Sequence, residues 1–171
     1  MNIKIEPIKK QDKEILRNLL EKYHYEFSQY NDMDVNQFGL YDYDYLDCYW
    51  TEENRYPFFI KVDDKLAGFM MVNDYQEVPL GTDYTLAEFF VMYKYRGKGV
   101  GRHSVKYLFD NFSGKWHLCY HPKNEISKLF WHNVVGDYTS GKYELLTDIK
   151  ELLYEDGVIR HVLRFDTKKR N

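Results

Sequence analysis

The sequence predicts a single α+β domain built around one central sheet. Its 171 residues are enough for one domain with a sizeable core, and 44% of them are hydrophobic, which is typical of a globular chain. Apolar residues form several short strand-like runs and recur at helical spacing in three longer segments. No linker-like shift in composition divides the chain, so we expect strands and helices to share one core.

The first elements follow from a change in apolar spacing. Residues 2–6 alternate apolar and polar side chains and predict a short strand. From Asp12, which can cap a helix N-terminus, one apolar stripe runs at helical spacing to Phe27. Residues 31–56 show neither the alternation typical of a strand nor the apolar spacing of a helix. They are acidic and rich in tyrosine, and we expect an irregular segment there.

Three strands are predicted in the middle of the chain. Residues 57–62 and 66–72 are apolar runs separated by Asp63-Asp64-Lys65, which is typical of a turn, so the two strands should form a hairpin. Residues 85–92 are a third buried run. A glycine-rich loop follows, and helical spacing then resumes over residues 105–112.

The C-terminal part returns to strand patterns around one more helix. Residues 116–120 predict a short strand, and Asn124 can cap the helix that follows. Asp156-Gly157 is a hairpin turn signal, which predicts that residues 149–154 pair with residues 158–165. The expected order is therefore strand, helix, irregular segment, three strands, helix, strand, helix and two strands.

The overall composition excludes several classes of function. A net charge of −3 and a pI of about 6.1 give no basic face for nucleic acid. No apolar run approaches the roughly 20 residues of a membrane helix, and the N-terminus has no apolar signal-peptide core, so we expect a cytoplasmic protein. Cys48 and Cys119 are too few for a disulfide framework and lack metal-ligand spacing, so no metal site is predicted.

The most informative segment is Arg96-Gly97-Lys98-Gly99-Val100-Gly101. Glycines leave the backbone bare, and the helix that follows directs the positive end of its dipole to the same place, so we expect a diphosphate cradle. A dinucleotide fingerprint does not fit, because its G-x-G-x-x-G spacing is missing and Trp116-His117 stand where an acidic residue is wanted. A nucleotide-hydrolysing P-loop does not fit either, because Arg102-His103 replace its terminal Lys-Ser/Thr.

Arg96-x-x-Gly99-x-Gly101 instead resembles the R/Q-x-x-G-x-G/A signature of the GNAT N-acetyltransferase superfamily. Its flanks, Phe89-Phe90-Val91 and the following helix, are similar to the coenzyme A motif of that family, and residues 124–131 resemble its asparagine-led fourth helix. The resemblance covers residues 2–166 and implies one GNAT-like domain, with residues 167–171 as a solvated basic tail. It also implies a mostly antiparallel mixed sheet with splayed fourth and fifth strands, flanked by about four helices.

The resemblance implies that acetyl-CoA is the cosubstrate. Its diphosphate is expected on the backbone N–H groups of residues 97–102, and a backbone N–H near Phe90 or Val91 is expected to polarise the acetyl carbonyl. Asn124 matches the asparagine that contacts the pantetheine arm, and it is equally suited to capping its helix. The residues that the resemblance assigns to the cofactor are Phe90, Val91, Met92, Tyr93, Arg96, Gly97, Lys98, Gly99, Val100, Gly101, Arg102, Asn124, Phe130 and Trp131, the last two being equally suited to the core.

Acetyl transfer also needs a base for the amine and an acid for the thiolate. Glu88 lies in an otherwise apolar strand, where partial burial would raise its pKa into the useful range; the alternative is a carboxylate that faces solvent or pairs with a lysine. His121 is the second candidate base, whereas His103 and His132 fall outside the expected reacting centre. The family often carries a tyrosine acid where Trp131 stands. An indole is no useful acid, so the proton falls to another tyrosine or to water.

The same resemblance places the acidic, tyrosine-rich stretch 39–47 on the acceptor side. Carboxylates interleaved with tyrosines suit a cationic amine through ion pairing and cation–π contact. The alternative is an acidic surface loop whose tyrosines cover the core. The residues predicted to bind the acceptor are Tyr41, Asp42, Tyr43 and Asp44.

The predicted function is acetyl-CoA-dependent N-acetyltransfer to a primary amine, on a small cationic molecule or a peptide, by direct attack. The alternative is a catalytically silent acyl-CoA-binding sensor or interaction module, which the Trp131 substitution favours. A nucleotide-binding protein is a third hypothesis. We expect a monomer or homodimer, with no nucleic-acid or membrane partner.

Overall fold

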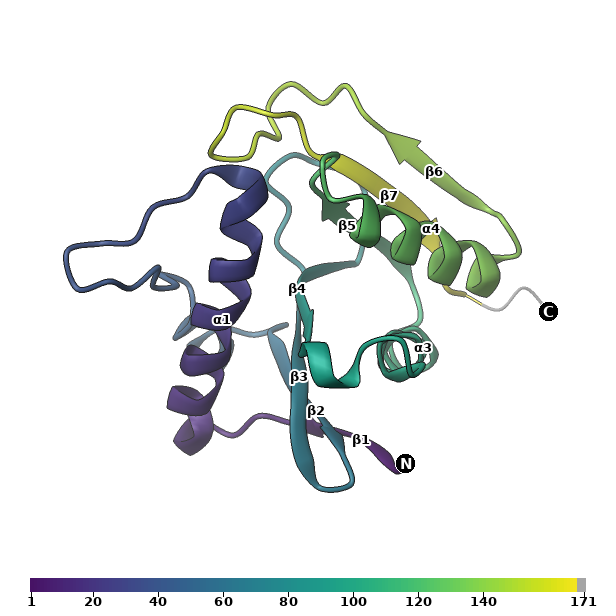
Figure 1. Ribbon diagram of the computed structural model, residues 1–171. Helices are drawn as coiled ribbons and strands as arrows, with labels where there is room; N and C mark the ends of the chain where they lie inside the picture. The colour runs from purple at the N-terminus through teal and green to yellow at the C-terminus, as the bar shows by residue number, and fades with distance from the viewer. Residues whose placement is uncertain (169–171) are drawn as a thin grey trace.

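Seven strands form one mixed sheet with helices on both faces in the computed structural model, which describes residues 1–168 (Figure 1). The strands are β1 (Ile3–Pro7), β2 (Tyr56–Val62), β3 (Lys65–Asn73), β4 (Tyr84–Val91), β5 (Lys115–Tyr120), β6 (Tyr143–Leu146) and β7 (His161–Asp166). The helices are α1 (Lys13–Asn31), α2 (Cys48–Thr51), α3 (Val100–Asn111) and α4 (Glu125–Thr139), with short 3-10 turns η1 (Lys10–Asp12) and η2 (Tyr93–Tyr95).

The strands lie in the order β1-β2-β3-β4-β5-β7-β6. Within residues 1–168, β4 and β5 pair in parallel and the other neighbouring strands pair antiparallel. This arrangement confirms the predicted α+β class, the single domain and the mostly antiparallel mixed sheet. The predicted cap at Asn124 is confirmed, because its side chain accepts a hydrogen bond from Ser127 N–H at 3.0 Å.

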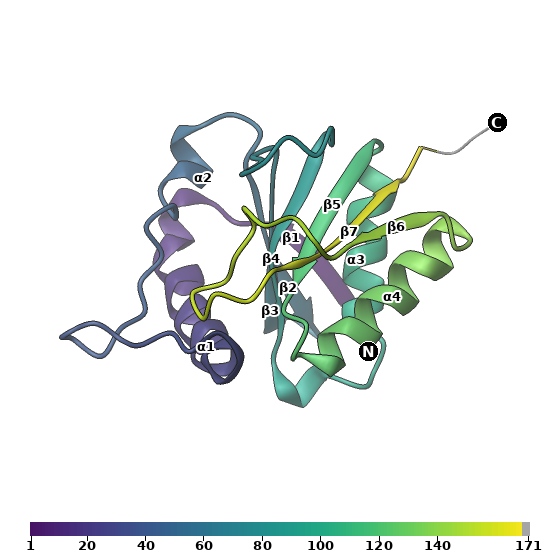
Figure 2. The same cartoon turned by 90° about the horizontal axis from the view of Figure 1, so that it is seen from above.

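Each face of the sheet buries its own apolar cluster, and the helices divide between the two faces (Figure 2). α1 and α2 cover a cluster that includes Leu16, Leu20 and Phe69. α3 and α4 cover a larger cluster around Leu108 and Trp116. Because successive strand residues point to opposite faces, the central strands are apolar on both sides and read as continuous apolar runs.

The predicted C-terminal hairpin is wrong in its first strand. The partner of β7 is β6, whereas residues 149–154 form an irregular connection with one isolated bridge, from Leu153 to Ile159. The Asp156-Gly157 turn itself does form, with Tyr154 N–H donating to Val158 O at 2.9 Å. A turn signal fixes only the residues beside it. The pairing of β7 is decided instead by burial of its apolar side chains against β5 and α4.

The sheet opens at its centre, where β4 and β5 part. They pair over Tyr84–Leu86 and Trp116–Leu118 only. The next residue, Ala87, is a bulge, because Glu88 pairs with Met71 while Leu86 pairs with the adjacent Val72 of β3. The bulge turns β4 away from β5, which continues beside β7. This is the splay that the family resemblance implies.

Gly68 lets β3 approach the end of β4 closely. A Cβ built at Gly68 would lie 1.9 Å from the Phe90 carbonyl oxygen. Just beyond this contact, Met92 N–H donates to Ala67 O at 2.8 Å. The missing side chain therefore fixes the path of the last residues of β4.

The described chain ends packed against the domain. Thr167 is buried, and its hydroxyl accepts a hydrogen bond from Gly114 N–H at 3.1 Å. Lys168 is exposed, while Lys169, Arg170 and Asn171 of the expected tail lie outside the described residues. Within residues 1–168, no helix is long and apolar enough to cross a membrane.

Candidate functional site

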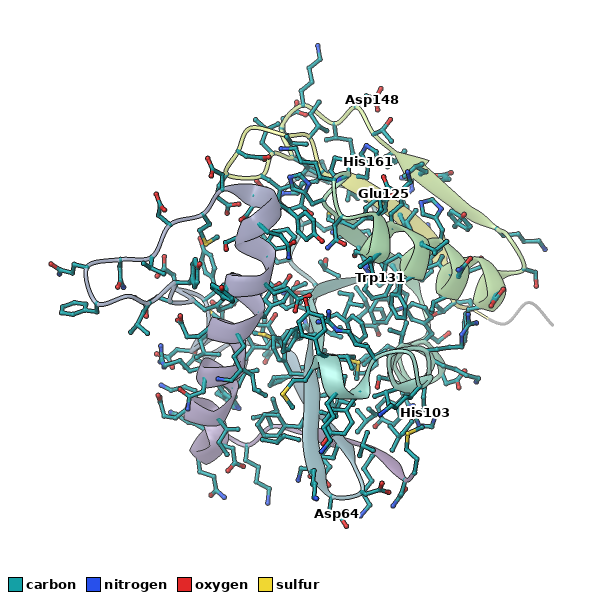
Figure 3. All side chains as sticks on the ribbon, viewed as in Figure 1. Asp64, His103, Glu125, Trp131, Asp148 and His161 are labelled. Carbon is teal, nitrogen blue, oxygen red and sulfur yellow. The ribbon has the colours of Figure 1, made fainter. Side chains whose placement is uncertain are left out.

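The parting of β4 and β5 opens into a cavity of about 660 Å³. α1 and the connection between β6 and β7 line one side, and the glycine loop and α4 line the other. Figure 3 shows Trp131 projecting from α4 toward the centre of the sheet, whereas His103 lies on the outer side of α3. The cavity therefore has two halves, one beside the loop and one beside α1.

The glycine loop forms the floor of the first half. Gly97 and Gly99 have φ angles of 69° and 78°, which only glycine adopts readily, and Gly99 is the N-terminal cap residue of α3. His103 N–H donates to Gly99 O at 3.0 Å, so the N–H groups before it in the first turn lack intrahelical acceptors. A Cβ built at Gly97 or Gly99 would meet nothing within 4 Å, whereas one at Gly101 would lie 3.1 Å from the Phe130 ring. Bare donors and open space together make a cradle for an anion.

The basic residues of the loop are held by other parts of the chain. Arg96 forms a two-pronged ion pair with Glu26 of α1, at 2.7 and 2.8 Å, and its Nε donates to Val91 O at 2.6 Å. Arg102 pairs with Asp137 of α4. Lys98 Nζ donates to Lys94 O at 2.9 Å and does not line the cavity. Arg96 thus joins α1 to the end of β4 across the cavity.

The remaining residues predicted to contact the cofactor lie on β4 and α4. Phe90, Val91 and Tyr93 line the cavity, as do Asn124, Phe130 and Trp131; Met92 is half-buried between the two apolar clusters. Trp131 is 5% exposed and its ring centroid lies 5.1 Å from that of Phe89. Trp131 therefore both packs in the core and faces the cavity.

Glu88 lines the cavity just after the bulge in β4 and is half-buried. Tyr43 OH donates to Glu88 Oε1 at 3.3 Å. Burial raises the pKa of Glu88 to about 7, although hydrogen bonds from Tyr23 and Tyr43 act in the opposite direction. The side chain still touches the cavity, so its carboxylate is accessible to a molecule bound there.

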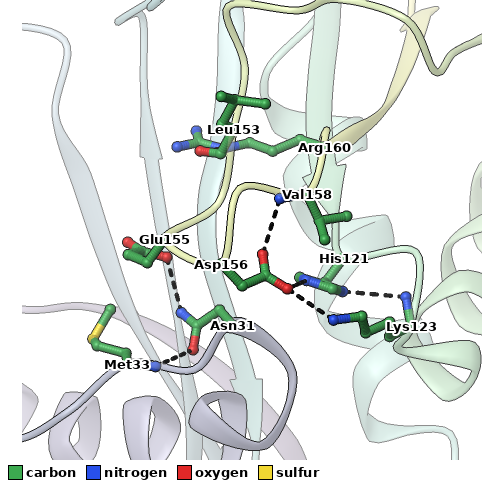
Figure 4. A network of polar contacts seen from close by, with 9 residues as sticks. All are labelled: Asn31, Met33, His121, Lys123, Leu153, Glu155, Asp156, Val158 and Arg160. Atoms are coloured by element: carbon green, nitrogen blue, oxygen red, sulfur yellow. Dashed lines mark hydrogen bonds and ion pairs between the residues drawn. The ribbon is translucent and has the colours of Figure 1, made fainter.

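His121 has a structural environment, which Figure 4 shows. It is fully buried; its Nδ1 accepts from Lys123 N–H at 3.1 Å, and its Nε2 lies 3.2 Å from Asp156 Oδ2. The proton therefore sits on Nε2, and neither nitrogen has a lone pair available for a substrate proton. These contacts fasten the Asp156 turn to the segment that precedes α4.

The structure separates the four residues predicted to bind the acceptor, Tyr41, Asp42, Tyr43 and Asp44. Tyr43 hydrogen-bonds to Glu88, as described above, but none of the four is among the cavity-lining residues. Asp42 and Asp44 are exposed, and Glu21 holds the backbone by accepting the N–H groups of residues 41 and 42, both at 2.9 Å. Acceptor binding by Tyr41, Asp42, Tyr43 and Asp44 stays a prediction.

Several cavity residues carry no sequence motif. Tyr120 of β5 lies at one end of a hydrogen-bonded chain: its hydroxyl is 2.8 Å from His132 Nε2, and His132 Nδ1 is 2.9 Å from the Tyr143 hydroxyl. Tyr154 and Glu155 reach the cavity from the β6–β7 connection. Because these residues come from separate elements, only the tertiary fold brings them together.

Comparison with known proteins places this geometry among related folds. The sequence matches the acetyltransferase (GNAT) family over residues 14–136, and no curated protein matches it significantly. An acetyltransferase from Thermus thermophilus has a TM-score of 0.70 and 14% identity over 97% of both chains. The paiA N-acetyltransferase from Thermoplasma acidophilum, solved with coenzyme A, has a TM-score of 0.60 and 11% identity over 97% of this chain and 99% of its own. For yncA from Salmonella typhimurium, solved with acetyl-CoA, the TM-score is 0.62 and the identity 14%, over 100% of this chain and 97% of its own.

Proposed function

We propose, from the premise that this chain belongs to the acetyltransferase (GNAT) family, that it transfers an acetyl group from acetyl-CoA to a primary amine by direct attack. The observation that carries this proposal is Glu88, a carboxylate that lines the cavity and whose pKa is raised to about 7 by burial. Such a base is half ionised at neutral pH and is suited to accept a proton from an alkylammonium group.

The glycine loop fits the diphosphate of acetyl-CoA. Bare N–H groups at the start of α3 match its anionic oxygens, and the space beside Gly97 and Gly99 is open. Arg96 is neutralised by Glu26, so most of the attraction comes from the backbone and the helix terminus. When bound, acetyl-CoA supplies an activated acetyl group on a thioester.

The end of β4 is suited to orient that acetyl group. Successive N–H groups of a strand point to opposite edges, so beyond Leu86 every second N–H of β4 faces the gap left by β5. A donor from Phe90 or Val91 would stabilise negative charge on the carbonyl oxygen, contributing on the order of 3 kcal/mol in a dry site. Gly68 holds these donors in place through the close β3–β4 contact.

Tyr120 is the proposed proton donor for the departing thiolate. Its hydroxyl is hydrogen-bonded to His132, which is hydrogen-bonded to Tyr143. This row of hydrogen bonds can return a proton to Tyr120 from the α4 side. Trp131 offers only an indole N–H, which is no useful acid. His132, predicted to lie outside the reacting centre, would then act through Tyr120.

A second candidate function is a coenzyme A-binding module without turnover. The observation that favours it is Trp131, a packed aromatic side chain at the position where the family often has an acidic hydroxyl. Binding of acyl-CoA without release of thiol would be its signature.

The test is thiol release from acetyl-CoA against a panel of amines, for the wild type and for Glu88→Gln. We expect the substitution to lower kcat/KM by about a hundredfold or more at neutral pH while leaving acetyl-CoA affinity, measured by calorimetry, unchanged. Glu53→Gln, at an exposed carboxylate, is the matched control. No thiol release with any amine, alongside intact coenzyme A binding, would contradict the transferase and support the silent module. Thermal stabilisation by ATP but not by coenzyme A would contradict both.

A further inference from the structure

Two carboxylates of the cavity wall have no cationic partner among residues 1–168. The arginines that reach the wall each form an ion pair: Arg96 with Glu26, Arg102 with Asp137, and Arg160 with Glu77. Glu88 and Glu155 also line the cavity, and no basic side chain in the described part of the chain lies within ion-pair distance of either. The half of the cavity beside α1 therefore keeps uncompensated negative charge.

Glu155 lies at the mouth of this half. It is exposed, and its Oε2 accepts a hydrogen bond from Asn31 Nδ2 at 3.0 Å at the end of α1 (Figure 4). The adjacent Asp156 is paired with Lys123 at 2.9 Å, so Lys123 does not neutralise Glu155. Of the two carboxylates, Glu155 is therefore exposed to solvent and Glu88 is half-buried.

Aromatic rings line this half of the cavity. Phe27 and Tyr154 have ring centroids 5.5 Å apart, and Phe27 and Tyr30 have centroids 6.1 Å apart. Faces of such rings attract ammonium groups. His24 also lines the cavity, and burial lowers its pKa, so it adds no positive charge at neutral pH. Arg160 lies over one face of the Tyr154 ring, 5.2 Å from its centroid, and pairs with Glu77 at 2.9 Å rather than with Glu88 or Glu155.

We propose that the preferred acceptor is a small linear diamine, with one nitrogen at Glu88 and the other, as ammonium, at Glu155 among these rings. This inference rests on the proposed function and names the substrate class of the same site. The reacting ammonium gives one proton to Glu88, and its nitrogen forms the N–C bond as the C–S bond breaks. The nitrogen loses a second proton as the intermediate collapses, the thiolate takes up one proton from Tyr120, and the hydrogen-bonded row behind Tyr120 is refilled from water. One proton, the one on Glu88, is released to solvent in total, and the second ammonium leaves unchanged.

The experiment compares unbranched diamines with amino alcohols of the same chain length, which keep one amine and lose the second charge. We expect kcat/KM to be about fivefold higher for the diamine, the size expected for one partly exposed ion pair. Glu155→Gln should remove this preference by lowering kcat/KM for the diamine to about that for the amino alcohol. Glu151→Gln, an exposed carboxylate in the same connection, should keep the preference. Raising the salt concentration should weaken the wild-type preference, because exposed charges are screened.

The outcomes separate this inference from the proposed function. Equal turnover of diamine and amino alcohol, or equal loss of both in Glu155→Gln, would overturn the diamine inference and leave the transferase intact. No turnover of any amine would overturn the transferase. In that case, calorimetric binding of the diamine in the presence of coenzyme A would test the diamine inference independently of turnover. Weaker binding to Glu155→Gln would support it, and unchanged binding would overturn it.

Discussion

Burial of Glu88 makes its ionised form unfavourable in the folded chain. Its pKa rises from the usual 4.5 to about 7 because the buried carboxylate loses the water that would stabilise its charge. The same shift that suits Glu88 to the proposed role of base therefore lowers the free energy of unfolding at neutral pH. The sign follows from proton binding: between the two pKa values the folded state holds more protons than the unfolded state, so stability falls as pH rises through this window.

Glu88→Gln should therefore stabilise the protein at high pH while lowering its activity. Below pH 4.5 the variant and wild type should unfold with equal free energy, because both side chains are neutral. Above pH 7 the free energy of unfolding of the variant should exceed that of the wild type by up to about 3 kcal/mol. This is the pKa shift of Glu88 converted at about 1.4 kcal/mol per pKa unit. Urea unfolding at several pH values measures this difference. A gain that does not depend on pH would contradict the assigned ionisation.

The sequence indicated Glu88 but not the residues around it. A carboxylate inside an apolar strand is visible in the sequence alone. In the sequence, Tyr120 and His132 look like ordinary strand and helix residues. Only the fold brings the Tyr120 hydroxyl within 2.8 Å of His132 Nε2. Glu155 is likewise one acidic residue among several in its connection. The signals were missing because these contacts join residues far apart in the chain.

At the scale of the elements, the path of β4 determines where the cavity forms. Three residues pair with β5, one residue bulges, and the rest follow β3 into the cavity. The strand itself was predictable from its apolar run, whereas the bulge depends on the register with β3. The prediction of the C-terminal hairpin was wrong for a related reason, because a turn signal does not determine which strand pairs with β7.

Gly68→Ala should disturb β4 more than an ordinary core substitution does. The new Cβ would sit 1.9 Å from Phe90 O, so the backbone must move at the residues proposed to polarise the acetyl carbonyl. We expect a loss of about 3 kcal/mol in the free energy of unfolding, in the range of overpacked sites, together with lower kcat. Gly136→Ala is the control, since its Cβ would meet the nearest atom, on the Tyr143 ring, at 3.6 Å, an ordinary contact, within helix α4. Its effect should be neutral or slightly stabilising, and equal losses in both variants would contradict the close-approach argument.

At the scale of the whole molecule, the cavity separates two groups of strands. β1 to β4 form one group, and β5, β7 and β6 form the other, joined directly over three paired residues on each side. A hydrogen bond from Asn31, at the end of α1, to Glu155, in the β6–β7 connection, adds a second contact between the two groups. A ligand that contacts both sides should therefore stabilise the entire fold.

Acetyl-CoA should raise the melting temperature by about 5–10 °C at a hundredfold excess over its Kd, from about 2.7 kcal/mol of binding linkage. Gly99→Glu should abolish this shift, because it places bulk and negative charge in the diphosphate cradle. Gly141→Glu is the control, since Gly141 has nearly the same φ, 77°, but follows α4. Differential scanning fluorimetry of the three proteins provides the measurement. A shift retained by Gly99→Glu would refute the assignment of the loop.

The parting of β4 from β5 has a further consequence for inhibition. Unpaired strand edges usually lie at the outside of a sheet, where they invite pairing with other chains. Here such an edge lies in the middle of the sheet, inside the cavity. Slender molecules with amide groups at strand spacing can pair with it, as an added strand would. An inhibitor built on such a backbone could occupy the site without imitating either the diphosphate or the thioester.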